Sequence, residues 1–161
     1  MVTKRVIAIS GTPGVGKSTL AESLSKKLGY LRIDLHDYYK EISSEYDRSK
    51  KCYNIDLVKF EKLVKDKLKE SKGVILDTHI SHLLSPKLVQ KCVILTFNDL
   101  HSLEKRLLER KYSKKKVREN LDSEIFQICL MEAKEKGHKI IEIECSGKSR
   151  KKVFEEVLKK V

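Results

Sequence analysis

The sequence contains no tryptophan, and prolines, glycines and aromatic residues are scarce. Two prolines and seven glycines in 161 residues exclude a collagen-like or low-complexity chain. No apolar run approaches the roughly 20 residues that a membrane-spanning helix needs, and the segment Met1–Ser10 has no signal-peptide pattern. We therefore expect one soluble domain over residues 1–161, monomeric and cytoplasmic, or nuclear if the source is eukaryotic.

Cysteine is also sparse, and its spacing excludes the usual metal patterns. The four cysteines are far apart and form no C-x-x-C pair, which disfavours a zinc site. Cys92 and Cys145 lie in apolar strand-like segments, and Cys129 lies in an apolar helical segment. We expect buried structural thiols at these positions.

Charge is abundant and strongly biased towards the positive sign. The 35 lysines and arginines outnumber the 23 acids, which gives a net charge of +12. The hydrophobic fraction of 40% is too high for a disordered polyelectrolyte. The excess charge is compatible with a nucleic-acid surface, a pocket for phosphates or a solvated face, and composition does not choose among them.

Short apolar runs alternate with amphipathic segments along the chain. This alternation predicts an α/β fold with a five-stranded parallel sheet covered by helices on both faces. A polar stretch from His36 to Asn54 interrupts the pattern and reads as an inserted flap. The predicted strands are Arg5–Ser10, Tyr30–Asp34, Gly73–Asp77, Lys91–Phe97 and Lys139–Glu144, and the predicted helices are Ser18–Leu28, Asp56–Lys69, Asp99–Lys111, Lys115–Lys136 and Ser149–Val161.

A glycine-rich pattern lies between the first predicted strand and the first predicted helix. Residues 11–18 read Gly-Thr-Pro-Gly-Val-Gly-Lys-Ser and match the P-loop pattern G-x-x-x-x-G-K-[ST]. In this strand-loop-helix context, backbone N–H groups hold phosphate oxygens, so a merely structural turn is disfavoured. The candidate nucleotide-binding residues are Gly11, Gly14, Gly16, Lys17, Ser18 and Thr19.

These residue types define the chemistry of the predicted site. Side chains in place of the glycines would block the approach of phosphates to the backbone. Lys17 is expected to reach the β- and γ-phosphates, Ser18 to ligate magnesium and Thr19 to contact the α-phosphate. The sequence therefore predicts a site for ATP with Mg²⁺.

Two further polar residues follow the third predicted strand. Asp77 ends the strand Gly73–Asp77, where the second magnesium-side acid of P-loop proteins lies. Without the P-loop, a helix or strand cap would be the more common role for such an aspartate. His79 follows two residues later, and we consider water positioning or proton transfer beside the simpler role of a satisfied polar residue.

Arginines are candidate catalytic residues because phosphoryl transfer requires positive charges that contact the transferred phosphoryl group. Arg106 and Arg110 are four residues apart and share a helix face. Arg110 begins a basic stretch that reads as a short lid between two helices, so Arg110 is the first candidate and Arg106 the second. Most of the run Lys114–Lys116 is interpreted as a solvated charged face.

Together these residues resemble the adenylate kinase isoenzyme six family, the adenylate-kinase-like ATPases of archaea and nuclei that include coilin-interacting nuclear ATPase proteins. The match lies in Gly11–Thr19 (GTPGVGKST), Asp77-Thr-His79, Arg106–Tyr112 (RLLERKY) and Lys116–Gln127 (KVRENLDSEIFQ). The last two segments are more specific than the P-loop, which many families share.

The resemblance implies a nucleoside monophosphate kinase fold with a monophosphate-binding flap over residues 34–56 and a lid over residues 110–119. It implies Mg-dependent transfer of the γ-phosphoryl group of ATP to AMP, ATP hydrolysis, and a lid contact of Arg110 with ATP. It also implies a role in maturation of small-subunit ribosomal RNA (pre-18S or 16S), with a platform ribosomal protein of the S-eleven type as partner and RNA contact left open.

Two residues depart from the family pattern. Lys111 stands where the family often has glycine after the lid arginine, and Lys40 stands where an arginine would grip the acceptor phosphate. A lysine there loses the bidentate fork. Three functions stay open: a metabolic nucleoside monophosphate kinase, an ATPase that acts in ribosome assembly with little kinase activity, and a small P-loop kinase for another metabolite.

Overall fold

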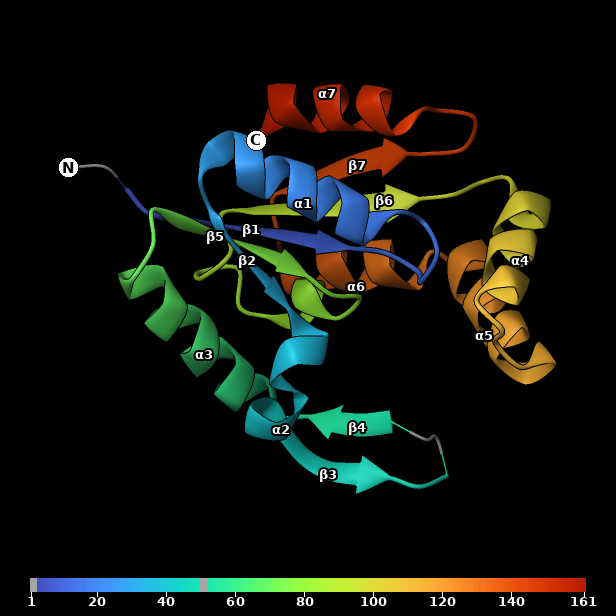
Figure 1. The fold of residues 1–161 in the computed structure, drawn as a ribbon, viewed down its shortest axis with the longest axis horizontal. Helices are drawn as coiled ribbons and strands as arrows, with labels where there is room; N and C mark the ends of the chain where they lie inside the picture. The colour runs from blue at the N-terminus through green and yellow to red at the C-terminus, as the bar shows by residue number, and fades with distance from the viewer. Residues whose placement is uncertain (1–2, 50–51) are drawn as a thin grey trace.

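A five-stranded parallel sheet forms the centre of the molecule (Figure 1). The structure, a computed structural model, describes residues 3–49 and 52–161. The strand order is β2-β5-β1-β6-β7, so β1 lies in the middle and its carboxyl end is flanked by two neighbours. The strands are β1 (Arg5–Ser10), β2 (Leu31–Asp34), β5 (Gly73–Asp77), β6 (Lys91–Thr96) and β7 (Ile140–Glu144).

Helices cover both faces of this sheet, as the sequence predicts. In the described part of the chain no helix is both long and apolar enough to span a membrane. The helices are α1 (Lys17–Leu28), α2 (Tyr39–Ile42), α3 (Leu57–Lys69), α4 (Leu100–Glu109), α5 (Lys114–Ile125), α6 (Ile128–Lys136) and α7 (Arg150–Lys160), with 3₁₀ turns at η1 (Leu35–Tyr38) and η2 (Ser81–Leu83).

The alternation of side chains along β1 separates the core into two layers. Ile7 and Ile9 pack in a cluster with α1, α4, α5 and α7, whereas Val6 and Ala8 pack in a second cluster with α3 and α6. All four side chains are at most 1% exposed. A parallel strand that is apolar on both faces is therefore buried on both faces, and this confirms the predicted fold class.

Most predicted boundaries agree with the structure to within two residues. The carboxylate of Asp56 accepts hydrogen bonds from the backbone N–H groups of Val58 and Lys59 at 3.0 and 3.2 Å. These bonds satisfy two of the free N–H groups at the start of α3. Asp56 is therefore the N-cap of this helix.

The prediction of one long helix over Lys115–Lys136 is wrong. The chain forms two helices, α5 and α6, which are separated at Phe126 and Gln127, and Gln127 has a left-handed φ of 50°. Helix α5 packs in the first core cluster and α6 packs in the second, on the other face of the sheet. A straight helix cannot reach both faces, so tertiary packing overrides the continuous helical pattern.

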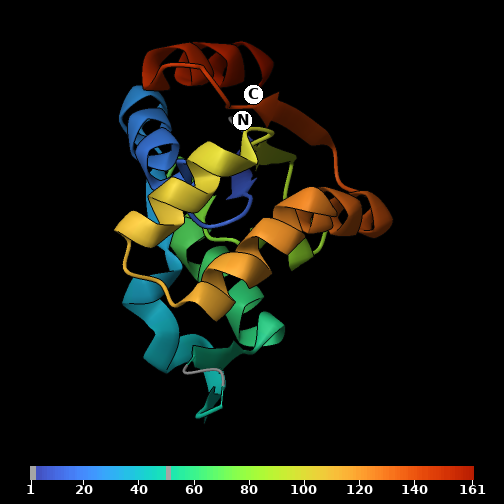
Figure 2. The ribbon, with the colours of Figure 1, turned by 90° about the vertical axis from the view of Figure 1, so that its right-hand side faces the viewer.

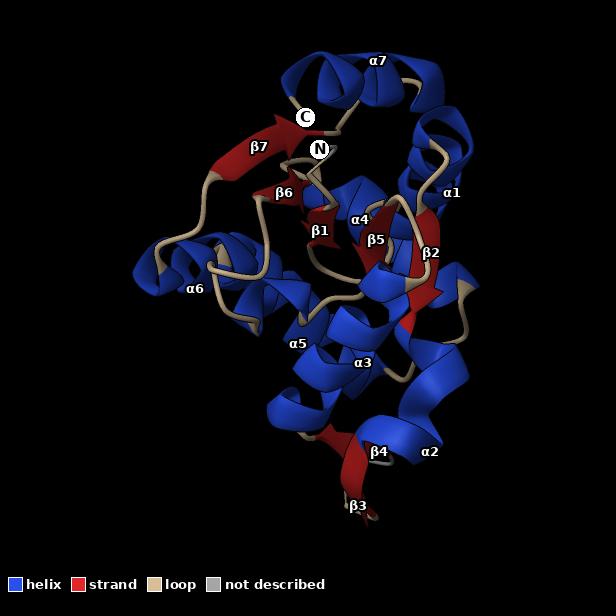
Figure 3. Ribbon diagram, turned by 90° about the vertical axis from the view of Figure 1, so that its left-hand side faces the viewer, coloured by secondary structure: helices blue, strands red, loops and turns tan. Residues whose placement is uncertain are grey.

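The polar stretch after β2 forms a separate projection. Its elements are η1, α2 and the antiparallel hairpin of β3 (Ser43–Asp47) and β4 (Cys52–Ile55). Figure 3 shows this hairpin at one end of the molecule, away from the parallel sheet. The hairpin of the predicted flap therefore projects from the core, whereas Leu35 and Ile42 at the base of the flap are buried in the second core cluster, and Lys40 lies exposed on α2.

A tight turn joins α4 to α5. Helix α4 ends at Glu109, two residues before the predicted end, and Lys111 has a φ of 60°. Figure 2 shows the two helices side by side across the end of the sheet. The family often has glycine at this position, and the left-handed backbone gives the physical reason.

We predict that Lys111→Gly raises the free energy of unfolding by about 0.5–1 kcal/mol, because glycine removes left-handed strain but adds freedom to the unfolded chain. Chemical denaturation measures this change. Lys115→Gly is the matched control, because Lys115 is exposed in helix α5, where glycine costs about 1 kcal/mol. A loss of stability in Lys111→Gly would contradict the strain at this turn.

Candidate functional site

The P-loop runs from the end of β1 to the start of α1, at the carboxyl edge of the sheet. Gly11 has a φ of 148°, and a Cβ atom there would lie 2.6 Å from the carbonyl oxygen of Leu95 on β6. Such a contact is too short for any side chain, so glycine is required at this position. The loop is therefore pressed directly against the sheet, with Ser18 and Thr19 in the first turn of α1 behind it.

Lys17 is the cation at the centre of the site. Its Nζ donates hydrogen bonds to the carbonyl oxygens of Gly11 and Thr12, at 2.8 and 3.1 Å. Burial lowers the pKa of Lys17 to about 8, although the nearby acid Asp77 opposes this shift and Arg110 adds to it. The amine is therefore mainly charged at pH 7 and loses its proton readily above pH 8.

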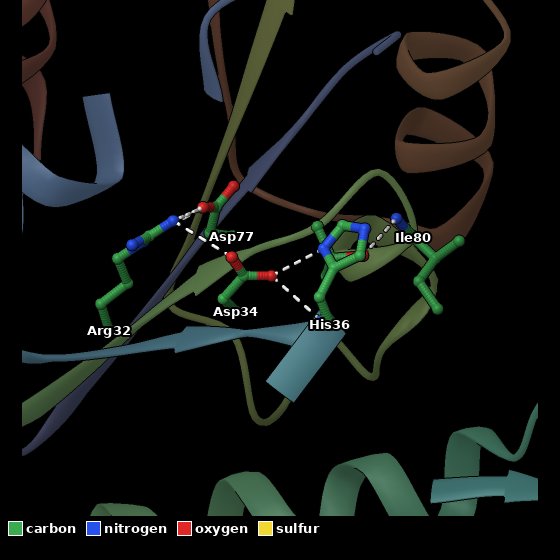
Figure 4. Close-up of polar contacts among 6 residues, drawn as sticks. Arg32, Asp34, His36, Asp77 and Ile80 are labelled. Atoms are coloured by element: carbon green, nitrogen blue, oxygen red, sulfur yellow. Dashed lines mark hydrogen bonds and ion pairs between the residues drawn. The ribbon is translucent and has the colours of Figure 1, made fainter. Parts of the chain in front are cut away.

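Asp77 is held by an arginine that the sequence analysis did not single out. Arg32 donates to Asp77 Oδ2 from Nε at 3.1 Å and from Nη2 at 2.5 Å, and Nη2 also lies 3.3 Å from Asp34 Oδ2 (Figure 4). Asp34 and Asp77 are register partners on β2 and β5. Arg32 therefore neutralises two carboxylates that the sheet places side by side.

The neighbouring acid Asp34 also organises the start of the flap. Its Oδ1 accepts hydrogen bonds from the backbone N–H of His36 at 3.0 Å and pairs with His36 Nδ1 at 2.9 Å, as the dashed lines in Figure 4 show. Although burial opposes the shift, hydrogen bonds from His36 hold the pKa of Asp34 below its usual value. The carboxylate stays ionised at neutral pH and anchors the flap to β2.

His79 lies at the surface of the site, on the loop after β5. Its backbone carbonyl oxygen accepts a hydrogen bond from the Ser10 hydroxyl at 3.0 Å, which ties this loop to the end of β1. The protein packed around the imidazole lowers its pKa to about 4, and the positive charges of Lys17 and Lys116 add to the shift. His79 is therefore neutral at pH 7, so a ring nitrogen is free of charge and can accept a hydrogen bond from water, while its affinity for a proton is low.

Buried polar contacts fix the segment that follows His79. Ser81 Oγ donates to the carbonyl oxygens of Ile9 and Thr78, both at 3.0 Å. His82 Nδ1 pairs with Ser10 Oγ at 2.6 Å. The loop that carries His79 is therefore fastened to the strand that leads into the P-loop.

The two candidate arginines lie on the α4 side of the P-loop. Arg106 Nη1 donates to the carbonyl oxygen of Gly14 at 3.2 Å, and its guanidinium carbon lies 4.6 Å from the centre of the Phe97 ring. Arg110 is exposed at the turn after α4, and its charge contributes to the lowered pKa of Lys17. Arg106 therefore contacts the P-loop directly, and Arg110 lies near enough to Lys17 for their charges to interact.

Sequence reasoning missed Glu124 and misjudged Cys129. Glu124 is 8% exposed, and its Oε2 accepts a hydrogen bond from the Thr12 hydroxyl at 2.7 Å. Cys129 is only partly buried, and its thiol lies 4.0 Å from the His79 carbonyl and close enough to interact with Lys17. Cys129 therefore borders the site, whereas Cys92 and Cys145 are buried as expected.

The donors at this site fit a magnesium ion that is held mainly by a substrate. Ser18 is exposed at the start of α1, and Asp77 supplies one carboxylate at the edge of β5. Among the described residues, no group of three or more histidines, cysteines, aspartates and glutamates could hold a metal ion alone. Mg²⁺ commonly binds through one or two protein oxygens together with phosphates and water.

The family model described as an AAA domain matches residues 7–127. A Methanocaldococcus jannaschii protein named "Putative adenylate kinase" is 36% identical over 157 residues, which cover 96% of this chain and 85% of that protein. The adenylate kinase isoenzyme 6 homolog of Schizosaccharomyces pombe is 37% identical over 145 residues, which cover 89% of this chain and 82% of that protein. The chain belongs to the adenylate kinase isoenzyme six family.

Solved structures with low sequence identity share the fold of this isoenzyme six family member. The YorR protein of Bacillus subtilis has a TM-score of 0.63 at 20% identity, and the match covers 95% of this chain and 93% of YorR. The shikimate kinase of Acinetobacter baumannii has a TM-score of 0.62 at 16% identity, with 98% and 93% covered. At this identity the likeness describes the fold alone.

The lowered pKa of Lys17 gives a prediction for phosphate binding. The dissociation constant of MgATP should rise about tenfold between pH 7 and pH 9, because the unbound amine loses its charge above a pKa of about 8. Isothermal titration calorimetry at several pH values measures this change. In the control Lys17→Arg the cation persists, so its affinity should not fall over this range; a wild-type affinity constant up to pH 9 would contradict the lowered pKa.

Proposed function

We propose that this protein is a Mg-dependent ATP:AMP phosphotransferase, an adenylate kinase that also hydrolyses ATP. The observation that carries the proposal is the convergence of Lys17, Asp77, His79 and Arg110 at the P-loop, in a chain of the isoenzyme six family. The names of the curated relatives support a nucleotide kinase. In this proposal the P-loop binds the donor ATP, the flap binds the acceptor AMP, and the lid closes over the donor.

In this proposal the chain binds ATP through backbone N–H groups of Gly11, Gly14 and Gly16 and through Ser18 and Thr19. Lys17 moves its amine from the loop carbonyls to the β- and γ-phosphates, and Arg110 adds a second positive charge from the lid. Ser18 and Asp77 would hold Mg²⁺, which would supply positive charge against the negative charge that develops on the phosphates. Arg106 orients the P-loop through the carbonyl oxygen of Gly14.

The neutral imidazole of His79 accounts for ATP hydrolysis in this proposal. A neutral ring nitrogen beside the γ-phosphate site can accept a hydrogen bond from the attacking water and so orient it. Transfer to AMP needs no such water, because the acceptor phosphate oxygen is the nucleophile. The acceptor lies between the lid over residues 110–119 and the flap over residues 34–56, where Lys40 provides a point charge from α2.

A second function, assembly of the small ribosomal subunit, is favoured by the outer surface of the flap. Glu41 and Glu45 are exposed there and would suit a basic platform ribosomal protein. Two further acids of this region are engaged, since Asp56 caps α3 and Asp47 accepts from the Ser49 hydroxyl. Contact with ribosomal RNA would use the basic surface elsewhere, including the run Lys114–Lys116.

One experiment tests the enzymatic proposal and separates the two functions. Pure protein is mixed with MgATP, with and without AMP, and ADP formation is followed; the measurement is repeated with the platform ribosomal protein. Fast AMP-dependent ADP formation supports the kinase, and an ATPase rate that changes with the ribosomal protein supports assembly. We expect Lys17→Ala to abolish both activities, and unchanged activities in this variant would refute the phosphate site.

We predict that His79→Ala lowers the rate of ATP hydrolysis by about 10²-fold, because the attacking water loses the hydrogen-bond acceptor that orients it. The dissociation constant of MgATP should change little, since the phosphates are bound by the P-loop. The matched control is His101→Ala, because His101 is exposed on α4 outside the site. Equal hydrolysis rates in the wild type and His79→Ala would remove His79 from the mechanism.

A further inference from the structure

Glu124 connects three parts of the molecule through its two carboxylate oxygens. Oε2 accepts a hydrogen bond from the Thr12 hydroxyl of the P-loop at 2.7 Å. Oε1 accepts a hydrogen bond from the backbone N–H of Phe97, the residue after β6, also at 2.7 Å. Glu124 itself belongs to α5, the helix that begins inside the lid segment 110–119. One buried side chain therefore joins the lid helix, the P-loop and the end of the sheet.

Helix α4 completes this connection from the other side of the lid. Arg106 on α4 donates to the carbonyl oxygen of Gly14 in the P-loop and stacks on the ring of Phe97. Leu103 and Leu107 of the same helix lie where a Cβ atom on Gly14 would contact them, at 3.3 and 3.4 Å. Both helices that flank the lid are thus fastened to the P-loop.

A buried carboxylate makes this connection at a cost in the free energy of unfolding. In residues 3–49 and 52–161, no ion pair within 4.0 Å compensates Glu124, and an unpaired buried charge costs stability. Its negative charge does act on Lys17, where it opposes the fall in pKa. The position of this acid under the phosphate site indicates a role in the site itself.

The break between α5 and α6 lies within one turn of Glu124. Gln127, three residues after Glu124, has the left-handed φ of 50° at which α5 ends and α6 begins. Because of the break, α5 and α6 are separate helices: α5 packs in the first core cluster and is held near its end by Glu124, while α6 packs on the far face of the sheet. A change at Thr12 would therefore reach α5 first, through Glu124.

We propose that Glu124 is a positioning residue that couples nucleotide binding at the P-loop to closure of the lid. When phosphates fill the P-loop, the Thr12 hydroxyl holds Glu124 and, through it, helix α5 in the orientation that brings Arg110 over the nucleotide. The proposal rests on the proposed function, since it requires that the P-loop binds ATP. It adds a residue on the lid helix that contacts neither the nucleotide nor the acceptor.

Limited trypsin digestion measures how accessible the lid is, because the lid contains exposed cleavage sites at Arg110, Lys111 and Lys114–Lys116. In the wild type we expect a magnesium complex of a non-hydrolysable ATP analogue to slow cleavage at these sites. In Thr12→Val and Glu124→Gln we expect this protection to be lost, and the affinity for the analogue to fall about tenfold, as when a hydrogen bond to a charged group is removed.

The matched control is Thr96→Val, which removes another buried hydroxyl, one that donates to the Ile143 carbonyl and not to Glu124. This variant should keep the protection, whatever stability it loses, and thermal unfolding of all variants measures that loss. If Glu124→Gln does not fold, Thr12→Val decides alone. Wild-type protection in a folded Thr12→Val protein overturns the proposal, whereas a wild type that does not bind the analogue overturns the proposed function instead.

Steady-state kinetics give a second readout that distinguishes coupling from a general loss of structure. Loss of lid closure should lower kcat for transfer to AMP more than it raises KM for ATP, because the P-loop still binds the donor. A change in KM for ATP with an unchanged kcat would show that Glu124 only shapes the P-loop, and would contradict the coupling.

Discussion

The close contact between Gly11 and the carbonyl oxygen of Leu95 is the constraint on which the rest of the site depends. A Cβ atom at Gly11 would be only 2.6 Å from that oxygen, so the P-loop can lie against β6 only with glycine there. This contact sets the position of Lys17 relative to the carboxyl edge of the sheet. The loops after β5 and β6 then bring His79 and Phe97 to the same edge, because parallel strands end together.

Local patterns in the sequence predict the part of the site that is built from neighbours along the chain. The P-loop residues and the helix that follows them form one continuous segment, and Asp77 ends a recognisable strand. Arg32 escapes prediction because its partner Asp77 is 45 residues away and is reached only through the pairing of β2 with β5. Nothing in the sequence near Arg32 indicates which strand will lie beside it.

The region from Lys115 to Lys136 shows a second limit of local patterns. Its helical period continues without glycine or proline, so the sequence predicts one helix. The structure breaks it because α5 and α6 must cover opposite faces of the sheet, and this demand is visible only once the strand order is known. Glu124, just before the break, accepts a hydrogen bond from Thr12 across 112 residues, and Cys129, just after it, borders the site.

The charges at the site balance one another more closely than the net charge of +12 suggests. Arg32 is paired with Asp77 and Asp34, and Lys17 lies near both Asp77 and Glu124. An excess of cations would bind phosphates tightly but would hold the product as firmly as the substrate. Acids placed behind Lys17 moderate this attraction. In the function proposed above, the additional positive charge on a bound triphosphate would come from Arg110 of the proposed lid.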